Sequence, residues 1–250
     1  MLILETIAVA FSMFSAIPMP QFAWTKRNMR YALCAFPLIG AVIGAACALW
    51  SFVCTRFALP ELLRGALFCL IPVLITGGIH LDGYADTWDA RASHASFERR
   101  QEIMKDAHLG AFAAIHLGCY LIASTALWSA LREYGMALAL GFCLSRALSA
   151  LAITTFPMAK DTGLAHSFAN AADKKRVRAV LGVQLCAICA AMCFCDGGVF
   201  VASSALLVFA YYYYMSKKQF GGISGDLAGW FLQTAELAML AAAIAYETIG

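Results

Sequence analysis

Long apolar runs separated by short charged clusters limit what this chain of 250 residues can fold into. Hydrophobic residues make up 62% of the chain and charged residues only 13%, whereas about a quarter of a typical soluble domain is charged. Because so few polar residues cannot cover a water-exposed surface, the apolar surface must face lipid. We therefore expect an all-α fold, a polytopic bundle of membrane helices.

Seven of the runs are predicted to be transmembrane helices, because most reach the roughly 20 residues that a helix needs to cross the hydrocarbon layer. An eighth apolar run, 1–19, lacks the basic start of a cleavable signal peptide, so we expect a retained N-terminal helix that spans or lies against the bundle. The whole chain, 1–250, is interpreted as one integral-membrane domain. The predicted spans are 31–55, 62–79, 110–131, 135–156, 179–195, 199–215 and 227–246.

The basic residues alternate between the connections of these spans. Four longer polar segments carry most of the 18 Lys and Arg residues, whereas the three short connections between them carry few. Because basic loops are retained on the cytoplasmic side of a membrane, the four segments are predicted to share the cytoplasmic face. These segments are 24–30, 80–109, 158–178 and 216–226.

The formal net charge of +3 follows from these membrane-flanking clusters, which suit anionic lipid. No basic surface interleaved with aromatic residues indicates nucleic-acid binding, so the lipid bilayer is an expected partner and nucleic acid is not. Nearly all of the ten cysteines lie inside apolar runs, where a free cysteine packs as a small hydrophobe. The CxxC spacing of Cys186 and Cys189 has no histidine near it, and we interpret it as packing rather than a zinc or redox site.

Residues 76–90 read TGGIHLDGYADTWDA and hold the strongest indication of chemistry. The spacing of Asp82, Asp86 and Asp89 places three carboxylates on one face of a helix. No basic residue at helical spacing offsets their repulsion, so a bound cation would stabilise them. Hard carboxylate oxygens suit Mg²⁺ or Mn²⁺, which also bind phosphates, although a solvated helix end is the alternative interpretation. His80 would face away from these aspartates on a continuous helix, which makes it a weaker candidate for acid–base or orienting work.

Two further polar groups fall on the same predicted face. The string MKDAHLG at 104–110 holds Lys105 and Asp106 directly before a span. The string KKQFGGISGD at 217–226 predicts a turn whose exposed backbone suits phosphate oxygens and whose Asp226 offers another metal ligand. An ordinary helix-linking turn capped by Asp226 is the alternative. The other residues of this turn that we predict to bind substrate are Lys218, Gly221, Gly222, Ser224 and Gly225.

Two charged residues fall inside apolar runs. Arg146 lies in the middle of its predicted span, where an unpaired charge would cost a few kcal/mol. We expect Arg146 to face the interior of the bundle and to reach a substrate phosphate or a carboxylate. Glu236, in the last span, is either its counter-ion or a residue of a polar cavity.

Together these strings resemble the cobalamin synthase family. The resemblance rests on GGIHLDGYADTWDA, MKDAHLG and GGISGDLAG, with FPLIG at 36–40 and the prolines Pro18 and Pro20, and it covers about 17–237. It implies an adenosylcobinamide-GDP ribazoletransferase. In that reaction a hydroxyl of α-ribazole attacks the cobinamide-side phosphorus of adenosylcobinamide-GDP, which releases GMP and forms adenosylcobalamin. Ribazole 5′-phosphate is an alternative acceptor that gives the phosphorylated product.

The resemblance also implies roles for particular residues. Asp82, Asp86 and Asp89 would hold Mg²⁺, with Asp226 or Asp106 completing the site. One of these aspartates, or His80, would take the hydroxyl proton. The implied location is the bacterial cytoplasmic (inner) membrane with the active site facing the cytoplasm. A homo-oligomer, or association with other enzymes of cobalamin assembly, is left open.

The chain departs from the usual pattern of the family at a few positions, while the core aspartates are intact, so we expect an active enzyme. These positions are Ala90 in place of Gly, Ala107 and His108 in place of a Ser-Arg pair, Ser224 in place of Thr, and Gln233 in place of Glu.

Two rival functions remain as alternatives. A transporter would place carboxylates near the bilayer midplane and show two similar halves, whereas Glu236 is the one carboxylate found at mid-span and no clear internal repeat is found. A CDP-alcohol phosphotransferase-type lipid enzyme uses similar aspartates, but its DGxxAR string is absent because Asp86 follows Ala85 where Arg would stand.

Overall fold

The computed structural model describes residues 2–106 and 108–249, and helices dominate these residues. The described ranges contain no strand, and an isolated bridge pairs Met158 with Ile223. The helices are α1 (Leu2–Phe14), α2 (Lys26–Met29), α3 (Ala32–Phe57), α4 (Glu61–Thr76), α5 (Ile79–Ala92), α6 (Phe97–Ile103), α7 (Ala111–Ala130), α8 (Met136–Thr155), α9 (Leu164–Ala171), α10 (Lys174–Cys193), α11 (Gly198–Phe220) and α12 (Gly225–Ile249).

Six helices are long and apolar enough to cross a membrane: α3, α7, α8, α10, α11 and α12. The pair of α4 and α5 adds a seventh candidate, bent by 98° at its break. The N-terminal helix α1 has 13 residues, fewer than the roughly 20 that cross the hydrocarbon layer, and it packs against α3. The predicted fold class is therefore confirmed: a multi-pass helical bundle of about seven spans with an additional N-terminal apolar helix.

The break between α4 and α5 changes the predicted boundary of one span. The predicted run 62–79 stops being helical after Thr76, because Gly77 and Gly78 adopt the left-handed backbone conformation, with φ of 66° and 79°. The apolar part, α4, continues the row of spans. The polar part, α5, turns 98° away from α4 and packs against α7 and α12.

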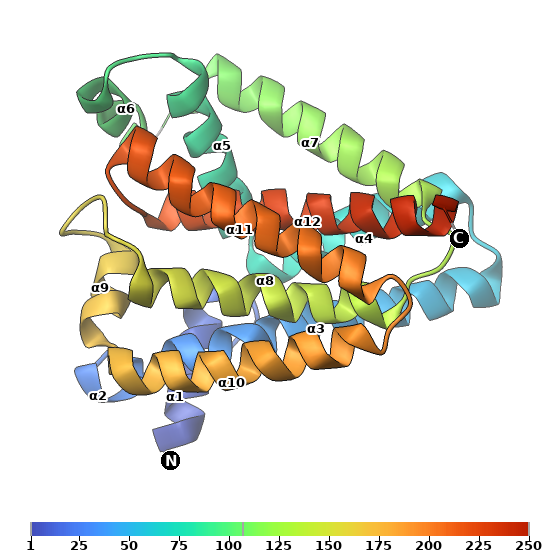
Figure 1. Ribbon diagram of the computed structural model, residues 1–250, viewed down its shortest axis with the longest axis horizontal. Helices are drawn as coiled ribbons and strands as arrows, with labels where there is room; N and C mark the ends of the chain where they lie inside the picture. Colours follow the sequence, from blue (N-terminus) through green and yellow to red (C-terminus); the bar gives the residue numbers. More distant parts are fainter. Residues whose placement is uncertain (1, 107, 250) are drawn as a thin grey trace.

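The segments predicted as polar connections contain short helices and gather at one end of the molecule. In Figure 1 this end is on the left, where α2, α6 and α9 and the turn between α11 and α12 lie. We call it the basic end, because it carries the Lys- and Arg-rich segments. The three short connections and the last residues of α12 lie at the opposite end. The side of the membrane that the basic end faces stays a prediction of the charge pattern.

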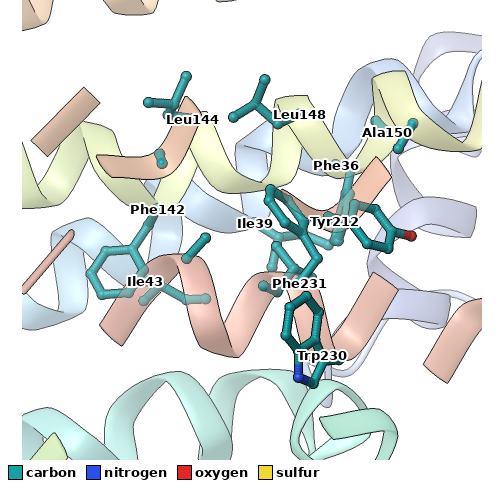
Figure 2. Close-up of a cluster of buried hydrophobic side chains, with 14 of the residues drawn as sticks. Phe36, Ile39, Ile43, Phe142, Leu144, Leu148, Ala150, Tyr212, Trp230 and Phe231 are labelled. Carbon is teal, nitrogen blue, oxygen red and sulfur yellow. The ribbon is translucent and has the colours of Figure 1, made fainter. Parts of the chain in front are cut away.

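Helix α8 is the central element of the core. It packs against α3, α10, α11 and α12, and most of its residues are buried. Figure 2 shows its Leu144 and Leu148 on the same cluster as Phe36 of α3 and Phe231 of α12. Helices α3 and α8 approach closely at Gly40, which lies directly against the backbone of Phe142 on α8.

This contact predicts a destabilising substitution. In Gly40→Ala the new Cβ would overlap the carbonyl group of Phe142, so α3 and α8 must move apart. We expect a loss of about 1–3 kcal/mol, typical of overpacking, measured as a lower thermal midpoint of the purified protein. The control is Gly182→Ala in α10, where a Cβ meets nothing within 4 Å. Equal midpoints for the two variants would contradict the close packing of α3 on α8.

Candidate active site

The aspartates of α5 are brought to the first turn of α12 by two glycines. A Cβ on Gly83 would lie 2.7 Å from the Cα of Asp226, and a Cβ on Gly229 would lie 2.7 Å from the carbonyl oxygen of His80. No other residue type fits so close a backbone approach. The residues around Asp82 and those around Asp226 therefore form one surface, although more than a hundred residues separate them in the sequence.

The turn before α12 is joined to the loop that follows α8. Ile223 donates its backbone N–H to the carbonyl oxygen of Pro157 at 2.8 Å, and the N–H of Ala159 donates to Ile223 at 2.9 Å. Gly222 fits directly against this loop, since a Cβ there would lie 2.5 Å from the same Pro157 oxygen. This pairing brings Lys160 to the side of α12 on which Asp226 lies.

Ser224, and not Asp226, caps α12, so the carboxylate of Asp226 is not needed for the cap and can bind another group. The N–H of Leu227 donates to Ser224 Oγ at 3.2 Å, and Ser224 Oγ lies 3.4 Å from Asp226 Oδ2. A serine oxygen on the third backbone N–H is the usual N-cap arrangement. The alternative in which Asp226 serves only as the cap is therefore not what the geometry shows.

A cavity of about 500 Å³ lies at the basic end between these elements. One part of its lining is polar and the other is apolar and aromatic, so it suits a ligand with a charged part and a flat apolar part. The polar lining includes His80, Asp82, Lys105, Ser149, Lys160, Thr162, Ser224 and Asp226. The apolar lining includes Met13, Phe14, Phe36, Ile153, Leu164, Phe168 and Leu232.

The carboxylates around the polar part repel one another. The pKa of Asp86 is raised to about 7, first by burial and then by the negative charges of Asp82 and Asp226, with Asp89 also contributing. Burial lowers the pKa of Lys160 in the same lining, and the charge of Asp226 opposes that shift. These carboxylates are therefore close together and incompletely neutralised by the protein's own cations.

His80 lines the same cavity as Asp82, although two positions along a helix separate the two side chains by about 200°. The helix α5 begins at Ile79, and the cavity contacts its first turn on more than one side. That His80 faces away from the aspartates stays a prediction. Burial lowers the pKa of His80 to about 3, which keeps the imidazole neutral. Its Nε2 atom is buried and has no hydrogen-bond partner.

Asp89 points to a different element. Its Oδ1 accepts a hydrogen bond from the N–H of Ala113 at 3.3 Å, and its carboxylate lies against Gly110 at the start of α7. A carboxylate at a helix N-terminus is stabilised by the free N–H groups and by the helix dipole. Asp89 thus positions α7 and is not among the residues that line the cavity; its role as a metal ligand stays a prediction.

Of the Lys105–Asp106 pair, only the lysine reaches the cavity. Asp106 Oδ1 lies 2.7 Å from Nδ1 of His108 and accepts that residue's backbone N–H at 3.0 Å, and these hydrogen bonds lower the pKa of Asp106. The neighbouring departure from the family pattern, Ala107, lies outside the described residues. Lys218 also stays outside the cavity and donates to the hydroxyl of Tyr214 at 2.8 Å.

The two charges inside the spans pair with each other. Arg146 donates to Glu236 Oε1 at 2.6 Å and its side chain is 1% exposed, while Ser145 donates to the same oxygen at 3.1 Å. The expectation that Glu236 is the counter-ion of Arg146 is confirmed, and neither residue is among those that line the cavity. Gln233 lies nearby and accepts a hydrogen bond from the hydroxyl of Tyr120, so this departure from the family pattern lies at the α7–α12 contact.

Three polar residues of the cavity were not singled out by the sequence pattern: Ser149, Lys160 and Thr162. In the sequence, Lys160 is one of several basic residues of the segment 158–178, and nothing there distinguishes it from the others. Ser149 stands in an apolar run, where a serine gives no signal. The placement of Lys160 and Thr162 depends on the tertiary pairing of the loop after α8 with the turn before α12, whereas Ser149 is placed by the packing of α8 itself.

The carboxylates suit a hard divalent cation in their chemistry. Asp82, Asp86 and Asp226 supply oxygen ligands whose mutual repulsion a cation would relieve. Among the residues that the structure describes, no group of three His, Cys, Asp or Glu side chains is already gathered as a metal site. The donor set fits Mg²⁺ or Mn²⁺ with part of the coordination shell left for water and substrate, which is how Mg²⁺ is commonly bound.

Comparisons with known proteins agree with the resemblance. The family described as cobalamin-5-phosphate synthase matches residues 6–244. The adenosylcobinamide-GDP ribazoletransferase of Lachnoclostridium phytofermentans is 43% identical, over 98% of this chain and 96% of its own length. Proteins of the same name from Clostridium perfringens and Geobacillus kaustophilus are 31% and 32% identical, each over 91% of this chain and 92% and 90% of their own lengths. No solved structure matches.

The raised pKa of Asp86 predicts how stability depends on pH. An unfolded aspartate has a pKa of about 3.9, and the folded value is about 7, so the folded state holds this proton more tightly. The stabilisation is present below about pH 4 and is lost as the pH rises through about 7. In chelator-treated protein, Asp86→Asn should remove this contribution. The thermal midpoint of the variant should therefore exceed that of the wild type by more at pH 8 than at pH 5.

Asp196→Asn, at an exposed position of the opposite end, is the matched control and should keep the wild-type pH dependence. The crowding of carboxylates around Asp86 would be contradicted if Asp86→Asn also kept it.

Proposed function

The chain belongs to the cobalamin-5-phosphate synthase family, and from this premise we propose that it transfers the adenosylcobinamide-phosphate group of adenosylcobinamide-GDP to α-ribazole. GMP is the leaving product, and α-ribazole 5′-phosphate is an alternative acceptor. The observation that carries the proposal is the cavity that is lined by both carboxylates and lysines, namely Asp82, Asp226, Lys105 and Lys160. A diphosphate needs both kinds of group, because cations neutralise its oxygens and carboxylates hold further positive charge against it.

The proposed chemistry is a displacement at phosphorus. The acceptor hydroxyl oxygen forms a bond to the cobinamide-side phosphorus, and the bond between this phosphorus and the oxygen shared with GMP breaks. The hydroxyl proton leaves, and GMP departs with the electron pair of the broken bond. No redox partner is needed.

Each part of the polar lining has a distinct task in this proposal. Lys105 and Lys160 neutralise diphosphate oxygens, and the free N–H groups at the start of α12, beside Gly225, favour the same anion. Asp82, Asp86 and Asp226 would hold Mg²⁺, which supplies positive charge to the diphosphate and to the departing GMP. The neutral His80 orients the acceptor through a hydrogen bond rather than through charge.

The proposed setting is the bacterial inner membrane, with the basic end facing the cytoplasm. The support is the charge pattern, since Lys- and Arg-rich segments gather at the end that holds the cavity. The diphosphate of adenosylcobinamide-GDP and the ribose of α-ribazole are polar, so both substrates would reach this end from water, whereas the opposite end offers only short connections.

Removal of single carboxylates tests the reaction. Asp82→Asn and Asp86→Asn should each lower GMP release from adenosylcobinamide-GDP and α-ribazole by at least roughly a hundredfold, because transition-state charge stabilisation is lost. Membrane insertion and purified yield should be unchanged. Asp196→Asn carries the same chemical change at the opposite end and should retain activity. Near-normal turnover by both site variants would contradict the assignment of these carboxylates to the active site.

Lys160 provides an independent test, because the structure and not the sequence pattern brought it to the site. Lys160→Gln removes a cation from the polar lining, so we expect kcat/KM for adenosylcobinamide-GDP to fall roughly tenfold or more, as for a lost charge-assisted phosphate contact. Lys174→Gln, at the exposed start of α10, is the matched control. Steady-state kinetics that give the two variants the same kcat/KM would exclude Lys160 from the phosphate site.

A further inference from the structure

The apolar half of the cavity is built from aromatic rings of three separate elements. The ring of Phe14, at the end of α1, has its centroid 4.5 Å from that of Phe36 on α3 and 5.3 Å from that of Phe168 on α9. Phe36 and Phe168 are fully buried in the core, and all three rings line the cavity. A ligand in contact with these rings is therefore in an apolar and aromatic environment, and the carboxylates and lysines line the same cavity.

Two polar atoms in this lining have no partner among the residues that the structure describes. There, His80 Nε2 and Ser149 Oγ are buried without a hydrogen bond, and their residues are 6% and 1% exposed. Buried polar groups are almost always hydrogen-bonded. The imidazole of His80 also lies near the ring of Phe36, with centroids 5.8 Å apart, and Ser149 lines the same cavity as the three rings. A ligand in the cavity would supply the missing partners.

We propose that this half of the cavity binds the aromatic base of the acceptor nucleoside, and that Phe168 and Ser149 determine its specificity. The inference rests on the proposed function for the identity of the acceptor. The base of α-ribazole is a methylated benzimidazole, which is flat and apolar and has few groups that form hydrogen bonds. Aromatic rings stack on such a base, and two polar atoms are enough to satisfy it.

The guanine base of the other substrate does not match this lining. Guanine carries several donors and acceptors along its edges, and burial among phenyl rings would leave most of them unpaired at a cost of a few kcal/mol. The corrinoid does not fit this lining either, because of the volume of the cavity. A cavity of about 500 Å³ is in the range that encloses a nucleoside-sized ligand, whereas the corrinoid macrocycle with its side chains is several times larger than a nucleoside and stays outside it.

In this proposal the parts of the two substrates follow one another along the cavity. The acceptor base lies among Phe14, Phe36 and Phe168, its ribose reaches towards Asp82, and the diphosphate lies between Asp82 and Lys160. The corrinoid and the guanosine extend away from the cavity at the basic end.

Binding of α-ribazole alone to the purified full-length protein in nanodiscs, measured by calorimetry without the second substrate, tests this assignment. Ser149→Ala should weaken binding roughly threefold to tenfold, as for one lost hydrogen bond, and Phe168→Leu should weaken it by a similar factor through lost stacking. Matched controls on α11 are Ser204→Ala and Phe209→Leu, which do not line the cavity and should bind like the wild type. Guanosine should not displace α-ribazole. Equal affinity in all five proteins, or displacement by guanosine, would overturn the assignment.

Kinetics separate this inference from the proposed function. If transfer is observed, Ser149→Ala and Phe168→Leu should raise the KM for α-ribazole and leave the KM for adenosylcobinamide-GDP unchanged. A rise confined to the KM for adenosylcobinamide-GDP would overturn the acceptor site while the transferase activity stands. If no transfer is observed but α-ribazole binding depends on Ser149 and Phe168, the proposed function fails and the nucleoside site stands.

Discussion

The close contact of α5 with α12 is the feature on which the candidate site depends. Gly83 and Gly229 let the two backbones meet where any larger residue would collide with the facing chain. The carboxylate of Asp226 then lies among those of α5, and the resulting repulsion is seen in the raised pKa of Asp86. A repulsive cluster at a tightly packed crossing is unfavourable by itself, and a cation bound there, as proposed above, would relieve the repulsion.

The membrane constrains how such a polar site can be built. Inside lipid each backbone group must be bonded within a helix, and the polar helix α5 is accommodated by turning 98° away from α4 at the basic end. Deeper in the bundle the charges are neutralised in place, as Arg146 pairs with Glu236. This pairing gives Glu236 a structural partner and removes the mid-span carboxylate that a transporter would need free.

The sequence predicted the elements of the fold better than their contacts. Apolar run length identified the spans, and the spacing of Asp82 and Asp86 identified the acidic helix, because both signals are local. The helix start at Ile79 was not foreseen, since it depends on the left-handed Gly78, and neither was the place of His80 in the cavity lining. Lys160 reaches the cavity through the tertiary pairing of its loop, Ser149 reaches it through the packing of α8, and Asp89 lies at the start of α7. No local pattern encodes these contacts.

The central claim is that carboxylates from α5 and α12 form one cation site. Titration of the purified full-length protein with Mn²⁺, followed by electron paramagnetic resonance, tests it most directly, because Mn²⁺ accepts the same oxygen ligands as Mg²⁺. A shared site predicts that the protein binds Mn²⁺, and that its affinity for Mn²⁺ falls by a similar factor in Asp82→Asn and in Asp226→Asn, although the two residues lie on different helices. Wild-type Mn²⁺ affinity in Asp226→Asn, with loss only in Asp82→Asn, would contradict it.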